Sequence, residues 1–148
     1  MDEHSTQDLE TLKRDLKTFL RRYRNNVECI ERLERKLVTL EGRITGLKSP
    51  SLSGMPRGGV PVTLADLMSD KMDLEDRIES LKAKSRDLKR EVCEKIDSLE
   101  NSKYCEILEA HFIEGKSFED IAENLGYTTR HVIKLYSEAI TVLAVSAH

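Results

Sequence analysis

The feature that most constrains the fold is an unbroken heptad repeat in the first third of the chain. From residue 9 to residue 47 the apolar residues recur at alternating steps of three and four, and eleven of the twelve core positions are apolar. The twelve are Leu9, Leu12, Leu16, Phe19, Tyr23, Asn26, Ile30, Leu33, Leu37, Leu40, Ile44 and Leu47. Such a repeat is typical of a coiled-coil helix. We therefore expect one long helix over about residues 6–47.

A second, less regular heptad repeat follows a break that is rich in proline and glycine. All three prolines and five of the seven glycines lie between residues 42 and 61. We interpret residues 48–62 as a connector, because these two residue types interrupt helices. Beyond it, apolar residues of the same phase predict a second helix over about residues 63–99.

The two repeats fit together as an antiparallel pair. Facing residues in such a pair have numbers with a constant sum, and a sum of 111 aligns the apolar positions in most layers. This register places Asn26 opposite Ser85, a polar layer of the kind that fixes register; exposure of both side chains to solvent is the alternative. We expect an all-α fold in which residues 1–100 form this coiled-coil hairpin. Apolar residues beside the seam either pack against the C-terminal segment or serve self-association: Leu20, Val27, Met68 and Ile96.

Shorter helices with clear end signals follow the second repeat. Residues 102–114 predict one helix, Ser117 is in position to cap the next, and Thr128 or Thr129 can cap the last. Two short helices joined by a tight glycine turn are typical of a helix-turn-helix. The small and aliphatic residues that this motif requires are Ile121, Ala122, Leu125, Gly126, Val132 and Leu135. We expect residues 101–148 to form a helix-turn-helix domain.

A family resemblance lies in the segment EGKSFEDIAENLGYTTRHVIKLY, residues 114–136. It resembles the helix-turn-helix of sigma-factor region 4, which reads the promoter −35 element. The order of coiled coil, connector, coiled coil and helix-turn-helix is similar to that of small phage and prophage proteins grouped with late-gene transcription activators of the RinA/ArpU type. The resemblance implies a regulator in the cytoplasm of the bacterial host that binds double-stranded promoter DNA as a homodimer or higher homo-oligomer. RNA polymerase is a further candidate partner. Nothing in the chain resembles sigma region 2, so a complete sigma factor is excluded.

The resemblance assigns candidate DNA contacts to the start of the last helix, because in such motifs this part of the helix enters the major groove. Arg130 is the best candidate for reading a base, since its planar guanidinium can bond guanine at two atoms. Thr129 and His131 face the groove or its walls, with a solvated surface histidine as the alternative for His131. The candidates that suit phosphate groups are Lys116, Thr128 and Lys134.

The charge of the C-terminal domain opposes DNA binding and requires basic residues from elsewhere. Residues 100–148 contain four Lys or Arg and eight Asp or Glu, a net charge of −4, whereas nonspecific affinity depends on neutralising phosphates. Residues 13–24 carry a net charge of +5 and residues 82–95 one of +3, and the predicted register brings both to the same end of the hairpin. Candidate phosphate contacts there are Arg21, Arg22, Arg24, Lys89 and Arg90. Ordinary outer-face charge on a coiled coil is the alternative.

Composition and motifs speak against an enzyme. Only 5% of residues are aromatic and 34% are charged, the four histidines lack metal-ligand spacing, and no glycine-rich phosphate loop is present. We expect no catalytic residue, metal, cofactor or membrane span, and three scattered cysteines indicate a reducing compartment. Two other functions stay open. One is a DNA-packaging recognition subunit, which a ring-shaped oligomer would favour. The other is an adaptor whose acidic C-terminal domain binds RNA polymerase or a host factor.

Overall fold

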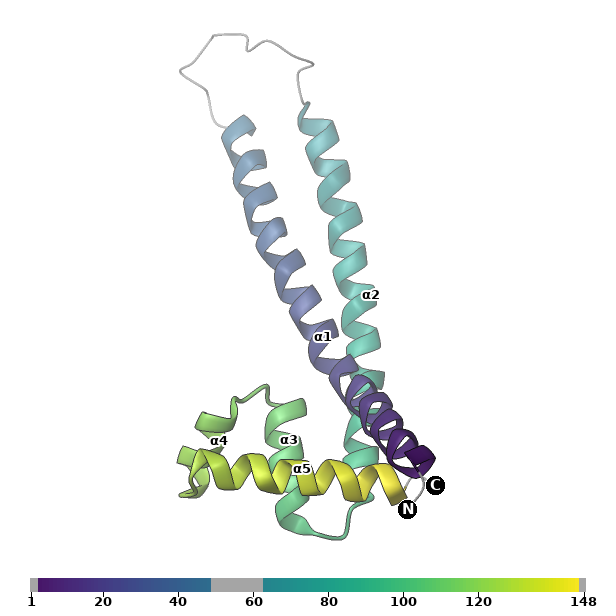
Figure 1. The fold of residues 1–148 in the computed structure, drawn as a ribbon. Helices are drawn as coiled ribbons and strands as arrows, with labels where there is room; N and C mark the ends of the chain where they lie inside the picture. Colours follow the sequence, from purple (N-terminus) through teal and green to yellow (C-terminus); the bar gives the residue numbers. More distant parts are fainter. Residues whose placement is uncertain (1–2, 49–62, 147–148) are drawn as a thin grey trace. The chain divides into compact units, whose positions relative to one another are not determined.

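Most of the part of the chain that the structure describes is helical (Figure 1). A computed structural model describes residues 3–48 and 63–146, and within these ranges there is no β-strand. The helices are α1 (Glu3–Lys48), α2 (Leu64–Asp97), α3 (Ser102–Phe112), α4 (Phe118–Leu125) and α5 (Thr129–Ser146). The expected all-α class is confirmed. The expected connector, residues 48–62, lies outside the described residues apart from Lys48, the last residue of α1.

Short polar side chains cap the N-termini of four helices. The side-chain oxygen of each cap accepts a hydrogen bond from a backbone N–H in the first turn, which satisfies a donor that has no partner within the helix. The caps are Thr63 for α2, Asn101 for α3, Ser117 for α4 and Thr128 for α5. The caps at Ser117 and Thr128 confirm the sequence prediction, and those at Thr63 and Asn101 add to it.

Packing divides the described chain into two compact units. One combines the residues up to Asn25 with those from Ser85 onward, and the other comprises residues within Asn26–Lys84. The expected boundary between residues 100 and 101 follows the end of the heptad repeat rather than the packing. It stays a prediction.

The unit within Asn26–Lys84 has a small apolar core to which α1 and α2 both contribute. Ile30, Leu33 and Ile78 are buried together. Half-buried residues surround them: Cys29, Leu37, Leu74 and Leu81. Apart from Cys29, these residues are the members of three layers of the predicted register, which stays a prediction.

Two ion pairs join the same segments of α1 and α2. Glu34 lies 4.0 Å from Lys82, and Glu41 lies 3.9 Å from Lys71. The residue number falls along α2 as it rises along α1, which is the order of an antiparallel pair. Exposed ion pairs of this kind contribute about 0–1 kcal/mol each, so the apolar core contributes more to holding the segments together.

Asn26, the polar member of the first heptad repeat, is buried with 8% of its surface exposed. Its Nδ2 donates a hydrogen bond of 2.8 Å to the backbone carbonyl of Leu81. The amide is therefore satisfied across the helix pair, as a buried polar group must be to avoid a desolvation penalty. The proposed layer with Ser85 stays a prediction.

The other unit has the larger core, and all five helices contribute to it. Within this unit α5 contacts both α3 and α4 (Figure 1). The buried apolar residues of this core are Leu16, Leu20, Val92, Ile96, Leu99, Ile107, Leu108, Phe112, Ile121, Ala122, Val132, Tyr136, Ala139, Ile140, Leu143 and Ala144. Leu20 and Ile96, two of the residues beside the heptad seam, are 0% and 1% exposed in this core. For these two, local packing with the C-terminal helices is the correct interpretation.

We predict that Leu20→Ala lowers the free energy of unfolding by about 2–5 kcal/mol, because it leaves a cavity in a core that is closed to solvent. Leu47→Ala, at a position that is 51% exposed, should change it by less than about 0.5 kcal/mol. Urea denaturation followed by circular dichroism measures both. A change of oligomeric state in Leu20→Ala without loss of stability would instead assign Leu20 to self-association.

Candidate nucleic-acid interface

The turn between α4 and α5 is short and closely defined. It comprises residues 126–128. Gly126 has φ +72°, in the left-handed region where a side chain is unfavourable. The Tyr127 N–H donates a hydrogen bond of 2.9 Å to the Ala122 carbonyl, and this bond closes the C-terminal end of α4. Ala122 and Val132 are buried on either side of the turn, whereas Leu125 and Leu135 are half-buried.

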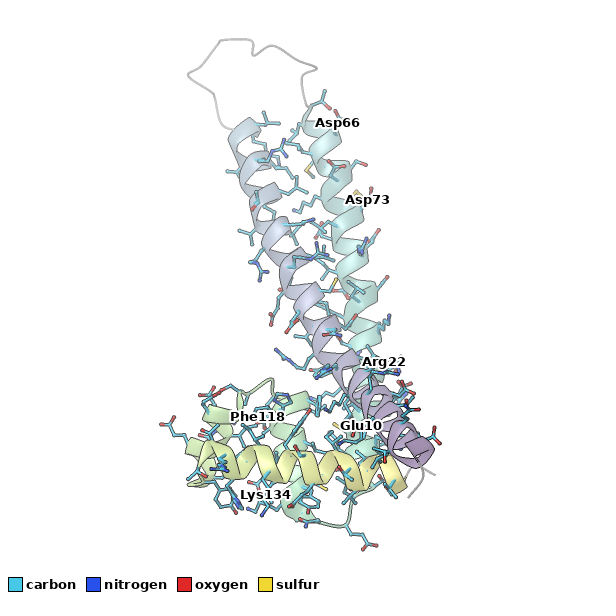
Figure 2. The ribbon with its side chains drawn as sticks, viewed as in Figure 1. Glu10, Arg22, Asp66, Asp73, Phe118 and Lys134 are labelled. Carbon is cyan, nitrogen blue, oxygen red and sulfur yellow. The ribbon has the colours of Figure 1, made fainter. Side chains whose placement is uncertain are left out.

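The first turns of α5 expose several of the predicted contact residues. Arg130, His131 and Lys134 are exposed, and Thr129 is half-buried. Within residues 3–48 and 63–146, neither Arg130 nor Lys134 has a carboxylate within 4 Å. Lys134 and Phe118 lie on opposite sides of α5 in Figure 2. This face therefore offers two cations without an acidic partner in the described structure.

Thr128 is exposed and also has a structural role. Its Oγ1 accepts a hydrogen bond of 3.1 Å from the His131 N–H, which caps α5. A hydroxyl that accepts in this way still has its own proton to donate. Thr128 can therefore cap α5 with its oxygen and at the same time donate its hydroxyl proton to an oxygen of a bound molecule.

Tyr127 and Lys103 extend this surface beyond the residues that the sequence pattern indicates. The Tyr127 ring lies edge-on to the His131 ring, with centroids 4.9 Å apart. Lys103 Nζ lies over the same ring, 5.5 Å from its centroid, and 3.2 Å from Glu106 Oε2. The hydrogen bond to Glu106 raises the pKa of Lys103 above its usual value. Because Lys103 belongs to α3, only the tertiary fold brings it to the start of α5.

Lys116, another predicted contact, lies in the turn between α3 and α4. Its Nζ is 3.1 Å from Glu114 Oε2, so an acidic neighbour balances its charge. Its backbone carbonyl accepts a hydrogen bond of 3.0 Å from His111 Nδ1. The Lys116 N–H in turn donates to the Ala110 carbonyl at 3.0 Å, which fixes the turn to the end of α3.

His111 lies at the centre of an aromatic cluster. Its ring is stacked on that of Phe118, with centroids 4.5 Å apart, and edge-on to those of Phe112 and Tyr136 at 5.0 and 5.4 Å. Burial lowers the pKa of His111, the hydrogen bond to the Lys116 carbonyl raises it, and the nearby Arg21 charge lowers it; the net shift is downward. The expectation of a histidine at the edge of the core is confirmed.

The protein should lose stability as pH falls because of His111. Its pKa in the folded chain is below the unfolded value of about 6.5, so the unfolded chain takes up the proton first. The free energy of unfolding should therefore decrease as pH falls through about 6.5, until the folded-state pKa is passed. Thermal melts from pH 7.5 to 5.0 should be less pH-dependent in His111→Gln. His131→Gln, at an exposed histidine, is the control, and equal pH dependence in both variants would contradict the assignment.

The five basic residues predicted on α1 and α2 divide into two groups. Arg22 is 3.4 Å from Glu91, and Arg90 is 3.4 Å from Asp87, so both have acidic partners. The remaining three, which have no carboxylate within 4 Å in the described chain, are Arg21, Arg24 and Lys89. The sequence alone makes all five equal candidates for phosphate contacts, whereas the structure shows which of them have a carboxylate partner.

Arg24 packs against the turn between α3 and α4. A Cβ atom added to Gly115 would lie 2.6 Å from Arg24 Cζ and 2.7 Å from its Nε and Nη2. Gly115 also has φ +71°. The backbone conformation therefore favours glycine at this position, and a side chain there would in addition have to displace the flexible end of Arg24.

We predict that Gly115→Ala destabilises the protein slightly more than Gly126→Ala does, because the flexible end of Arg24 has to move away from the added Cβ. Both positions have nearly the same positive φ and share a backbone penalty of about 1–2 kcal/mol, but a Cβ at Gly126 meets nothing within 4 Å. Urea denaturation of the two variants should show the difference, and it should disappear in an Arg24→Ala background. A difference that persists without Arg24 would locate the clash elsewhere.

The described residues contain no group of three or more His, Cys, Asp or Glu side chains that could hold a metal ion. Cys29, Cys93 and Cys105 are free thiols. In the ranges that the structure describes, no helix has the length and apolar character needed to cross a bilayer.

No protein-family model, curated protein or solved structure matches the chain.

Proposed function

We propose that this protein is a phage- or prophage-encoded transcription regulator that binds promoter DNA. In this proposal α4 and α5 act as a helix-turn-helix, and α1 and α2 pair as an antiparallel coiled-coil hairpin. The observation that carries it is the pair of exposed cations, Arg130 and Lys134, on the helix that follows the Gly126 turn. Neither has a carboxylate within 4 Å in the described chain.

The chemistry of these side chains suits the two parts of DNA recognition. The start of α5 enters the major groove, where the Arg130 guanidinium bonds the O6 and N7 atoms of guanine. Lys134, one turn later, contacts a phosphate as a point charge. The Thr128 hydroxyl, whose oxygen accepts a hydrogen bond from the His131 N–H, still has a proton that it donates to a second phosphate.

Self-association is part of the proposal. Two copies place two recognition helices on one duplex, which raises the affinity of a module that makes few contacts alone. Val142 and Val145, on the last turns of α5, are 45% and 57% exposed. Exposed aliphatic residues of this kind support a contact between copies at the C-terminal end of α5, whereas Arg130 lies at its N-terminal end.

A second candidate function is an adaptor that binds RNA polymerase or a host protein. It is favoured by the net charge of −4 over residues 100–148 and by the exposed acids of α4, Glu119, Asp120 and Glu123. An acidic surface repels a phosphate backbone and complements a basic protein surface. DNA binding by the purified protein distinguishes the two candidates.

We predict that Arg130→Ala weakens binding to the preferred DNA site by about 1–3 kcal/mol and relaxes sequence preference, since no side chain then bonds the guanine at two atoms. Lys134→Ala should weaken preferred and random DNA alike. The preferred site is first selected from a random-sequence DNA pool with the wild-type protein, and fluorescence anisotropy then gives the affinities.

Lys36→Ala is the control for this comparison, because it removes one exposed positive charge from the other compact unit. Arg130→Ala that behaves like Lys36→Ala would contradict the assignment of α5 as the recognition helix. Failure of the wild type to bind DNA at low salt, together with binding to purified polymerase, would support the adaptor instead.

A further inference from the structure

We propose that Arg21 and Arg24 of α1 form a binding site for a phosphate of the DNA backbone beside the start of α4. This inference rests on the proposed DNA binding and adds to it a second element outside α4 and α5. Both arginines belong to the same compact unit as α3, α4 and α5. They are separated by one helical turn and therefore lie on the same side of α1.

The side chain of Arg24 lies against the turn that precedes α4. Its guanidinium lies against Gly115, where any Cβ would be within 2.6–2.7 Å of three of its atoms. Gly115 is exposed and Arg24 is half-buried, so the guanidinium lies at the surface of the turn. A half-buried arginine has less side-chain entropy to lose when it binds an anion than a fully exposed one.

Arg21 lies one helical turn before Arg24, on the same side of α1. Its positive charge also lowers the pKa of His111 on α3 and opposes the upward shift that burial gives the pKa of Tyr136 on α5. His111 is bonded to the backbone carbonyl of Lys116, in the turn itself. Arg21 and Arg24 thus bring two positive charges to the neighbourhood of one short loop, residues 113–117.

Three other basic residues of this unit are already paired with acids. Lys116 is 3.1 Å from Glu114, Arg22 is 3.4 Å from Glu91, and Arg90 is 3.4 Å from Asp87. Arg21 and Arg24 have no carboxylate within 4 Å among the residues described. Within the described chain, the ion pairs therefore leave three of the five candidate residues of α1 and α2 without an acidic partner, namely Arg21, Arg24 and Lys89. Of these three, Arg24 lies against the turn before α4, and Arg21 is one helical turn from it.

A DNA phosphate is the anion that fits this position. In a helix-turn-helix the first helix crosses the DNA backbone while the second enters the groove, and α4 begins three residues after Gly115. The first turn of α4 carries Glu119 and Asp120, which repel a phosphate. Two guanidinium groups beside that turn offset this repulsion and can bond phosphate oxygens in a bidentate manner.

The test compares two double variants that each remove two positive charges. Arg21→Gln with Arg24→Gln removes the proposed site, whereas Arg22→Gln with Arg90→Gln removes two ion-paired arginines. DNA affinity is measured by anisotropy across a salt titration, with circular dichroism as the control for folding. In the first variant the slope of log K against log salt should become shallower by roughly 0.9 for each phosphate that is no longer neutralised. It should change little in the second.

Equal changes of slope in the two variants would overturn the proposal, because the arginines would then act only through net charge. A wild type that binds no DNA would instead refute the proposed function. Methylphosphonate-substituted DNA provides a second measurement that does not depend on the stability of the variants. At least one neutralised phosphate should weaken wild-type binding but leave the Arg24→Gln variant unaffected. If every such substitution weakens both proteins equally, no phosphate binds Arg24 and the proposal fails.

Discussion

The burial of the apolar face of α5 is the interaction on which the candidate interface depends. Val132, Ala139 and Leu143 are completely buried in a core that α1 and α2 complete through residues such as Leu20 and Ile96. A helix with one face fixed in this way has no choice of which face it presents to solvent. The exposure of Arg130 and Lys134 is therefore a consequence of packing, and the N-terminal part of α1 belongs to the same unit as the helices whose orientation it helps to set.

Local signals in the sequence predict the helix ends and the turns well. Ser117, Gly126 and Thr128 act within a few residues of themselves, through a cap or a left-handed turn, so their effect can be deduced without the rest of the fold. The roles of Leu20, Arg24 and Lys103 cannot be deduced in this way. Each depends on residues far away in the chain: the C-terminal helices for Leu20, Gly115 for Arg24 and Tyr127 for Lys103.

The charges of the protein follow the same rule: the sequence gives their number along the chain, whereas the fold determines which of them form ion pairs. Counting charges identifies an acidic C-terminal region and two basic runs. The counts do not reveal that Glu91 and Asp87 already occupy two of the arginines. In water such exposed pairs are weak, but the carboxylate beside a paired guanidinium repels an approaching phosphate. The free charge of a surface is therefore smaller than its formal charge.

The hydrogen bond between His111 and the Lys116 carbonyl has a chemical consequence for the whole cluster. A carbonyl can only accept, so Nδ1 carries the proton of the neutral ring and Nε2 keeps a lone pair. The backbone of the turn thereby selects one tautomer of a ring that is stacked on Phe118 at the start of α4. One imidazole proton thus links the peptide geometry of the loop to the orientation of an aromatic side chain on the following helix.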